Sequence, residues 1–281
     1  MSHQIPLQSV RQIGEIQHRA ARAVPAAAQD YREGCWLRYG DSEATWWAGA
    51  VLMHDSRQSP ELRTSIATAE DFYAARRAPA RFQVCPACPA DLDEELSRRR
   101  YAVKSVISLQ VATTECMAAQ PSAPSLQVDI SGELTDEWFQ LMLMAGHGQV
   151  ADPAPEWRLQ QRVNALSAYA TVSISGQQVA AGRAVADTGW VGMFNMTTLP
   201  HARRRGAASA VLAALADWAI SQGCPQMYLQ VERDNTAALR LYRHAGFEEL
   251  CTYHYRVQDC ETSIDVRRIR CLLYTSDAAD D

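Results

Sequence analysis

The chain has 281 residues, enough for one large domain or two modest ones. Hydrophobic residues make up 47% and charged residues 21%, which is ordinary for a globular protein. The formal net charge of −5 argues against a nucleic-acid partner or an anionic membrane surface, and it is compatible with a cationic substrate such as an amine.

Neither a membrane span nor a targeting segment is evident in the sequence. No apolar run reaches the roughly 18 residues that a membrane helix needs. The first residues, Met1-Ser-His-Gln-Ile-Pro6, lack the basic and apolar regions of a signal peptide. We therefore expect a cytoplasmic protein with no membrane partner.

In the N-terminal half, the secondary-structure pattern is weak at first and becomes clearer after residue 68. Trp46 and Trp47 are neighbours on a predicted strand, so their side chains are expected on opposite faces, one of them exposed. Residues 69–84 predict a helix, a turn and a strand. Residues 91–101 predict a second helix, and the alternating residues 103–111 predict the next strand.

Eight scattered cysteines indicate free thiols rather than a disulfide framework. Cys85-Pro-Ala-Cys88 is the only CxxC pair. A zinc site would need a second Cys or His pair at ligand spacing, and none follows in this half of the sequence. We interpret the pair as a loop with two thiols and expect no metal.

The order of elements is repeated after a linker. Residues 113–125 are small, polar and proline-containing, which is typical of an interdomain linker. Residues 212–231 and 236–247 again predict a helix, a strand and a second helix. The step from Val84 to Tyr101 is 17 residues and that from Val231 to Phe247 is 16, which favours two related α/β units.

The C-terminal unit has the stronger pattern. A strand is predicted at its start, followed by two helices, a three-strand meander and a long helix, at 125–131, 134–145, 156–166, 168–175, 178–187, 190–198 and 206–221. Residues 271–281 resemble a translated sequencing-library adapter, so we exclude them from the fold.

The segment between the last meander strand and the long helix carries the clearest chemical signal. A helix start presents backbone N–H groups without intrahelical partners at the positive end of the helix dipole. Small side chains at Gly206, Ala207 and Ala208 allow a ligand to approach those amides. With charge added by Arg203–Arg205, the segment predicts a cradle for a pyrophosphate.

Two motifs carry a family resemblance. Arg203-x-x-Gly206-x-Ala208 matches an Arg/Gln-x-x-Gly-x-Gly/Ala signature. A second block matches Asn-x-x-Ala-x-x-x-Tyr-x-x-x-Gly-Phe at Asn235, Ala238, Tyr242, Gly246 and Phe247. With both motifs in order, residues 125–257 resemble the GNAT acetyltransferase superfamily, and the N-terminal half more loosely resembles the degenerate partner of tandem GNAT proteins.

The resemblance implies a fold and a domain plan. The fold is α/β, with two tandem GNAT-like units, each a mixed, mostly antiparallel sheet flanked by helices, and with the C-terminal unit complete. The expected domains are a degenerate one over 1–116, a linker over 117–125 and a catalytic one over 126–260.

The resemblance also implies acetyl transfer from acetyl-CoA to the primary amine of a small molecule or a protein. Residues expected to bind the cofactor are Asn195, Met196, Thr198, Arg203, Arg204, Arg205, Gly206, Ala207, Ala208, Ser209 and Asn235. Tyr242 occupies the position of the thiolate acid, and the Met196 amide is placed to polarise the thioester oxygen.

Several interpretations stay open beside this one. The general base is Glu232 or a water chain, because the strand 190–198 has no acidic residue. Asn235 is also a good N-cap for the following helix, and Tyr242 also fits a packed core. His147 and Asp152 are candidate substrate contacts. A non-catalytic acyl-CoA-binding protein and an interaction module are the alternative functions.

Overall fold

The structure is a computed structural model that describes residues 7–54, 61–115, 126–146 and 152–258. The described chain divides into two compact units. Unit 1 contains the residues up to 107 together with 251–258, and unit 2 contains 108–250. The predicted linker at 117–125 and the adapter-like residues 271–281 lie outside the described residues.

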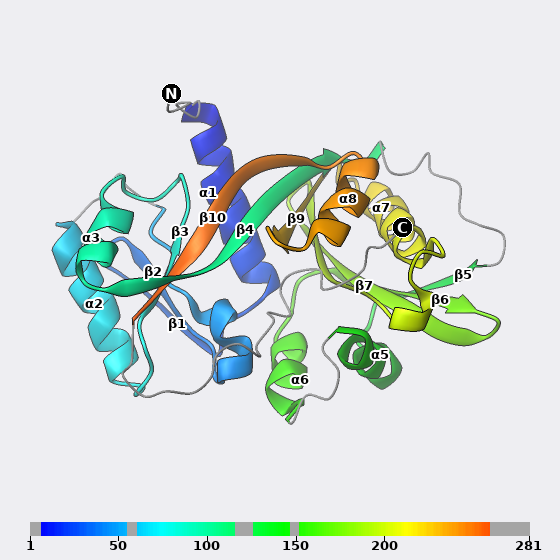
Figure 1. Cartoon of the computed structure of the whole chain (residues 1–281), viewed down its shortest axis with the longest axis horizontal. Helices are drawn as coiled ribbons and strands as arrows, with labels where there is room; N and C mark the ends of the chain where they lie inside the picture. Colours follow the sequence, from blue (N-terminus) through cyan, green and yellow to red (C-terminus); the bar gives the residue numbers. More distant parts are fainter. Residues whose placement is uncertain (1–6, 55–60, 116–125, 147–151, 259–281) are drawn as a thin grey trace. The chain divides into compact units, whose positions relative to one another are not determined.

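Unit 1 combines a small hairpin with helices and short strand pairs (Figure 1). Strands β1 and β2 pair with each other in antiparallel fashion, and β3 pairs with the last residues of β10. Its elements are α1 (Leu7–Ala23), β1 (Ala28–Arg32), β2 (Cys35–Tyr39), η1 (Glu43–Gly49), α2 (Leu62–Ala74), β3 (Arg81–Val84) and α3 (Leu92–Arg98). Two long strands, β4 (Tyr101–Thr113) and β10 (Glu248–Gln258), have residues in both units.

The expectation for the two neighbouring tryptophans is wrong. Trp46 and Trp47 lie in the 3-10 helix η1, whose N-cap Ser42 accepts a hydrogen bond from the Thr45 amide. Successive side chains on a helix do not point to opposite faces, so both indoles can be buried, and they are only 7% and 3% exposed. Trp46 packs edge-on against Tyr255, with 5.0 Å between ring centroids.

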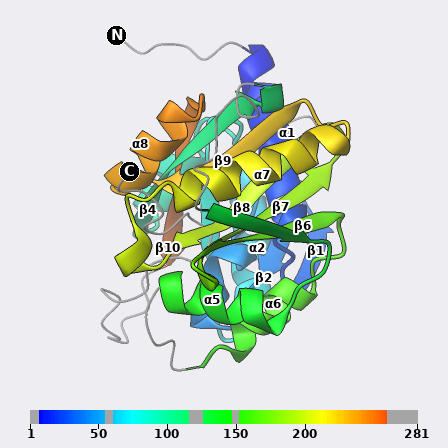
Figure 2. The same ribbon diagram turned by 90° about the vertical axis from the view of Figure 1, so that its right-hand side faces the viewer.

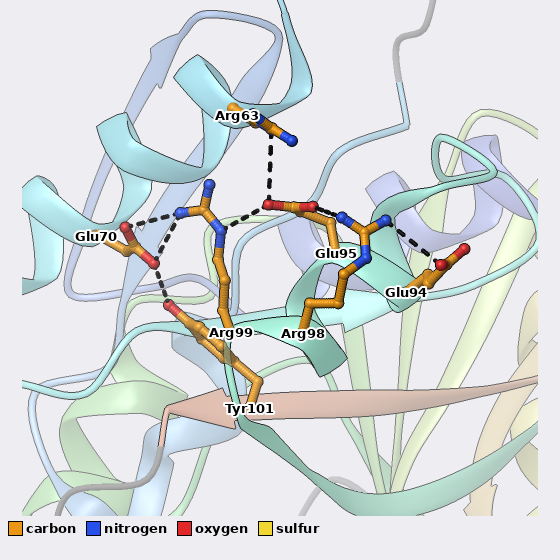
Figure 3. Close-up of polar contacts among 7 residues, drawn as sticks. All are labelled: Arg63, Glu70, Glu94, Glu95, Arg98, Arg99 and Tyr101. Carbon is orange, nitrogen blue, oxygen red and sulfur yellow. Dashed lines mark hydrogen bonds and ion pairs between the residues drawn. The ribbon is translucent and has the colours of Figure 1, made fainter.

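A polar network joins α2, α3 and the start of β4 in unit 1 (Figure 3). Arg99 contacts Glu70 at 3.2 Å and Glu95 at 3.1 Å, and the Tyr101 hydroxyl donates to Glu70 at 3.0 Å. Burial is the main cause that raises the pKa of Tyr101, and the nearby Glu70 carboxylate adds to it. The network therefore holds α2, α3 and the start of β4 together by charge-assisted hydrogen bonds.

Unit 2 is built on a mixed, mostly antiparallel sheet. The strands follow the order β9-β8-β7-β6-β5, in which β5 to β8 are antiparallel neighbours and β8–β9 is parallel. Its elements are β5 (Leu126–Ser131), α5 (Asp136–Gly146), α6 (Ala154–Gln161), β6 (Ser167–Ile174), β7 (Gln177–Asp187), β8 (Trp190–Thr198), η3 (Pro200–Ala202), α7 (Ala207–Ser221), β9 (Gln226–Glu232) and α8 (Thr236–His244). The predicted α/β class is confirmed.

Helices cover both faces of this sheet, and successive residues of β7 face them in turn because side chains alternate along a strand. A Cβ added at Gly182 would lie 2.6 Å from Val211 on α7, so α7 packs tightly on that face (Figure 2). The next residue, Arg183, points the other way and contacts Gln160 on α6. No described helix combines the length and the apolarity that a bilayer crossing requires.

Candidate functional site

Strands β8 and β9 separate part-way along their length. Their parallel register runs from Trp190 opposite Gln226 to Met193 opposite Leu229. Beyond that point β8 continues to Thr198 and β9 to Glu232, and no pair joins these described residues. The separation leaves backbone edges that an extended ligand can pair with, as an added strand would.

A β-bulge in β8 accounts for the separation. Ala181 pairs with Thr197 and Arg183 with Phe194, so Asn195 and Met196 together face the single residue Gly182. Asn195 has a φ of +55°, a conformation that asparagine tolerates better than most residues. A bulge bends and twists its strand, so β8 turns away from β9 at this point.

The residue opposite the bulge is held in place by a side chain from α5. The indole of Trp138 donates to the Gly182 carbonyl at 3.2 Å, which satisfies a group displaced from the regular ladder. The Trp138 ring is 1% exposed and packs edge-on against Tyr169 at 5.0 Å. The bulge is therefore a packed feature of the fold.

The helix start predicted from the sequence follows directly from β8. After η3, Arg204 has a φ of +57° and Gly206 a φ of +75°, and α7 then begins at Ala207. The N-cap residue is a glycine, and the first turn of α7 contains no acidic residue. Its first backbone N–H groups thus have no intrahelical acceptor, an arrangement that suits an anionic ligand.

All the predicted cofactor residues except Asn235 lie at these two features. Asn195, Met196 and Thr198 are in the bulged end of β8, all less than 9% exposed. Residues 203–209 form the turn and first helical residues, with Arg204 and Arg205 exposed and Ala207 and Ala208 buried. The two groups are adjacent in the chain and belong to one unit.

The predicted acid and base lie on the elements that follow. Tyr242, on α8, is completely buried with its ring edge-on to Phe247 at 5.8 Å, in the same apolar cluster as Met193 and Met196. Glu232 is the partly exposed last residue of β9, three positions after the last residue paired with β8. The Asn235 side chain accepts from the Ala238 amide at 3.0 Å, which confirms its N-cap role.

A buried polar cluster lies on the face of the sheet opposite α7, and it was not predicted from the sequence. Arg183 is 0% exposed, donates to Gln160 at 2.9 Å and lies over the Phe194 ring at 5.1 Å. Burial lowers the pKa of Arg183, whereas Tyr169 and Glu156 act in the opposite direction. An arginine in the middle of an otherwise apolar strand was the signal available in the sequence.

A pocket of about 410 Å³ opens beside this cluster. Gln160 and Tyr169 form part of its wall, together with Leu134, Trp157 and Ser167. Residues that contact Arg183 thus also line a space large enough for a small molecule.

Of the two candidate substrate contacts between α5 and α6, Asp152 and His147, the structure describes only Asp152. Asp152 is exposed, and its carboxylate accepts from the Ala154 amide at 3.0 Å, next to the start of α6. His147 lies outside the described residues.

Comparison with known proteins agrees with this architecture. The family model described as "Probable histone acetyltransferase Rv0428c C-terminal" matches residues 10–256. The chain belongs to this family. It is therefore a member of the GNAT superfamily, and the predicted membership is confirmed.

Individual relatives agree with this assignment. The "Uncharacterized N-acetyltransferase YobR" of Bacillus subtilis is 26% identical over 259 residues, 88% of this chain and 98% of that protein. Among solved structures, a GCN5-related N-acetyltransferase from Kribbella flavida has a TM-score of 0.69 at 18% identity, covering 93% of this chain and 98% of that one. A tandem GNAT protein from the clavulanic acid biosynthesis pathway has a TM-score of 0.65 at 10% identity, covering 92% and 90%. These relatives and the fold support acyl transfer as the general activity.

Proposed function

We propose that the chain transfers an acetyl group from acetyl-CoA to a primary amine by direct attack, with the cofactor held in unit 2. The observation that carries the proposal is the separation of β8 from β9 immediately before the start of α7. An extended polar chain ending in a diphosphate needs both features in this order, a strand edge and then a helix N-terminus.

The residues at the separation suit the pantetheine part of acetyl-CoA. The hydroxyl oxygens of Thr197 and Thr198 are buried and make no hydrogen bond to any other described residue. Buried polar atoms in folded proteins nearly always have a partner. The backbone of Asn195, Met196 and Thr198 beside them would pair with the amides of the pantetheine chain.

The start of α7 suits the diphosphate. The amides from Arg204 to Ser209 would surround the phosphate oxygens, and Arg203, Arg204 and Arg205 would add positive charge. Ala207 and Ala208 have methyl side chains, so the ligand can reach the backbone. A side chain at Gly206 would be strained by its positive φ.

Three groups would manage the charge and the protons of the reaction. The Met196 amide would stabilise the oxyanion that develops on the thioester carbonyl. The Tyr242 phenol would donate its proton to the departing thiolate. Glu232, at the open end of the separation, would accept the amine proton, and a chain of water molecules to bulk solvent is the alternative.

Two measurements on the wild-type protein test the proposal. Acetyl-CoA at one hundred times its dissociation constant should stabilise the fold by about 2.7 kcal/mol, which a thermal shift detects. An amine panel should then give acceptor-dependent release of the CoA thiol. A thermal shift without thiol release would indicate a binding protein, and no shift at all would indicate an interaction module.

The choice between the two bases is tested by Glu232→Gln. If the carboxylate accepts the proton, turnover falls by roughly 10²-fold, the usual size of a general-base contribution. If turnover does not change while acetyl-CoA still shifts the melting temperature, the water chain is the base.

A further inference from the structure

Three ligand-type side chains meet in unit 1, in a place that has no part in the proposed acetyl transfer. His54 follows the short bridge between Leu52 and Trp36, and Cys85 and Cys88 flank a turn immediately after β3. The His54 Nε2 atom is 3.4 Å from the Cys85 Sγ, and the two Sγ atoms are 3.8 Å apart. All three ligand atoms lie within 4.8 Å of one another.

The His54–Cys85 and Cys85–Cys88 distances match two edges of a tetrahedral zinc site. With a Zn–S bond of about 2.3 Å and a Zn–N bond of about 2.0 Å, tetrahedral angles give S···S edges of about 3.8 Å and S···N edges of about 3.5 Å. A disulfide, in contrast, needs its sulfurs at about 2.05 Å. The spacing of Cys85 and Cys88 is therefore that of two ligands around one ion.

The surroundings hold the three side chains in place. A Cβ added at Gly14 on α1 would lie 3.5 Å from the Cβ of Ala87 and 3.6 Å from that of His54, so α1 packs closely against both segments. The His18 ring, also on α1, meets the His54 ring edge-on at 5.2 Å. Cys85 is only 7% exposed, whereas Cys88 is partly exposed, so one side of the pair is open to a water ligand.

Two further contacts order this region. The side-chain amide of Gln83 donates to the side-chain oxygen of Gln17 at 2.7 Å. Both side chains are buried, and the bond fixes β3 to α1. The backbone N–H of Cys85 points at the Cys88 sulfur at 3.4 Å.

We propose that His54, Cys85 and Cys88 bind one Zn²⁺ ion, with water as the fourth ligand. Binding converts two thiols to thiolates and releases two protons, so the site with neutral His54 carries no net charge. Among the abundant divalent ions, zinc is the one that two thiolates and an imidazole suit best. The ion would tie together the segment after Leu52 and the turn after β3, against which α1 packs.

The proposal replaces the expectation of no metal, which rested on the missing second Cys or His pair. The third ligand is a single histidine 31 residues before Cys85. Spacing along the chain could not reveal it, because the fold alone brings the two segments together.

The test is a Co²⁺ titration of the full chain after removal of bound metal under reducing conditions. We expect one equivalent to bind, with thiolate-to-cobalt charge-transfer bands and the visible bands of tetrahedral cobalt, and Zn²⁺ to displace it. Cys85→Ser should lower the zinc affinity by at least about 100-fold. Cys35→Ser, which changes a buried thiol elsewhere in unit 1, should leave the affinity unchanged.

Several results would overturn the proposal. The wild-type protein would show no charge-transfer bands, or Cys85→Ser would bind zinc as tightly as the wild type. A native Cys85–Cys88 disulfide whose reduced form binds no zinc would make the pair a redox couple. If the variant does not fold, the cobalt spectrum of the wild type decides alone.

Discussion

Gly206→Val is the substitution that separates cofactor binding from stability most cleanly. Gly206 has a φ of +75° at the start of α7, where a branched side chain is strained and would also stand among the first helical amides. Gly189 provides a matched control, since it has a φ of +77° in the turn between β7 and β8 and no atom within 4 Å of an added Cβ.

The strain should be similar at the two positions. An L-residue in the left-handed region costs about 1–2 kcal/mol. For a protein of this size each kcal/mol lowers the melting temperature by roughly 2–4 °C, so both variants should melt several degrees below the wild type.

The stabilisation by acetyl-CoA should differ between the two variants. At one hundred times the wild-type dissociation constant, acetyl-CoA adds about 2.7 kcal/mol to the wild type and to Gly189→Val. Gly206→Val should lose most of this gain in a thermal-shift titration. An undiminished gain in Gly206→Val, or an equal loss in Gly189→Val, would refute the placement of the diphosphate at α7.

Further predictions concern one side chain each. Tyr242→Phe should lower kcat by at least about 10²-fold with acetyl-CoA affinity nearly unchanged, and steady-state kinetics with unaltered kcat would remove its acid role. Asn235→Ala removes the N-cap of α8 and should cost about 1 kcal/mol in urea unfolding, whereas no loss would mean the cap contributes nothing. The Arg256 guanidinium hydrogen-bonds to Asp93 and lowers the pKa of that carboxyl. The contribution of this pair to the stability of the fold is therefore present above the unfolded pKa of about 3.9 and is lost as the pH falls. Asp93→Asn should therefore cost up to about 1 kcal/mol at pH 7 and less in acid; a difference that grows in acid would contradict this.

Local patterns were sufficient for most of unit 2. The alternation in 178–187 and 190–198 and the apolar stripe of 206–221 reflect direct contacts of each side chain with one sheet face or one helix, so β7, β8 and α7 appear within a few residues of the predicted bounds. The turn at Gly206 was predictable for the same reason, because its backbone requirement is local.

Features that depend on distant partners were not predictable in this way. The bulge at Asn195 is defined by its register with Gly182 and by the Trp138 indole from α5. The burial of Arg183 depends on Gln160 from α6. Each needs an element brought close by the fold, which no pattern within one segment records.

The prediction that Trp46 and Trp47 lie on a strand, with one of them exposed, failed for a different reason. Trp46 and Trp47 have high strand propensity, but the cap at Ser42 and the contact of Trp46 with Tyr255 favour a short helix. Tertiary packing outweighs propensity over so short a segment.

Backbone hydrogen exchange with and without acetyl-CoA tests the cofactor site most directly. The amides of residues 195–198 and 204–209 should exchange more slowly when the ligand is bound, because the first group would pair with pantetheine and the second with the diphosphate. Binding that leaves both segments unprotected, with slower exchange only in unit 1, would contradict the account.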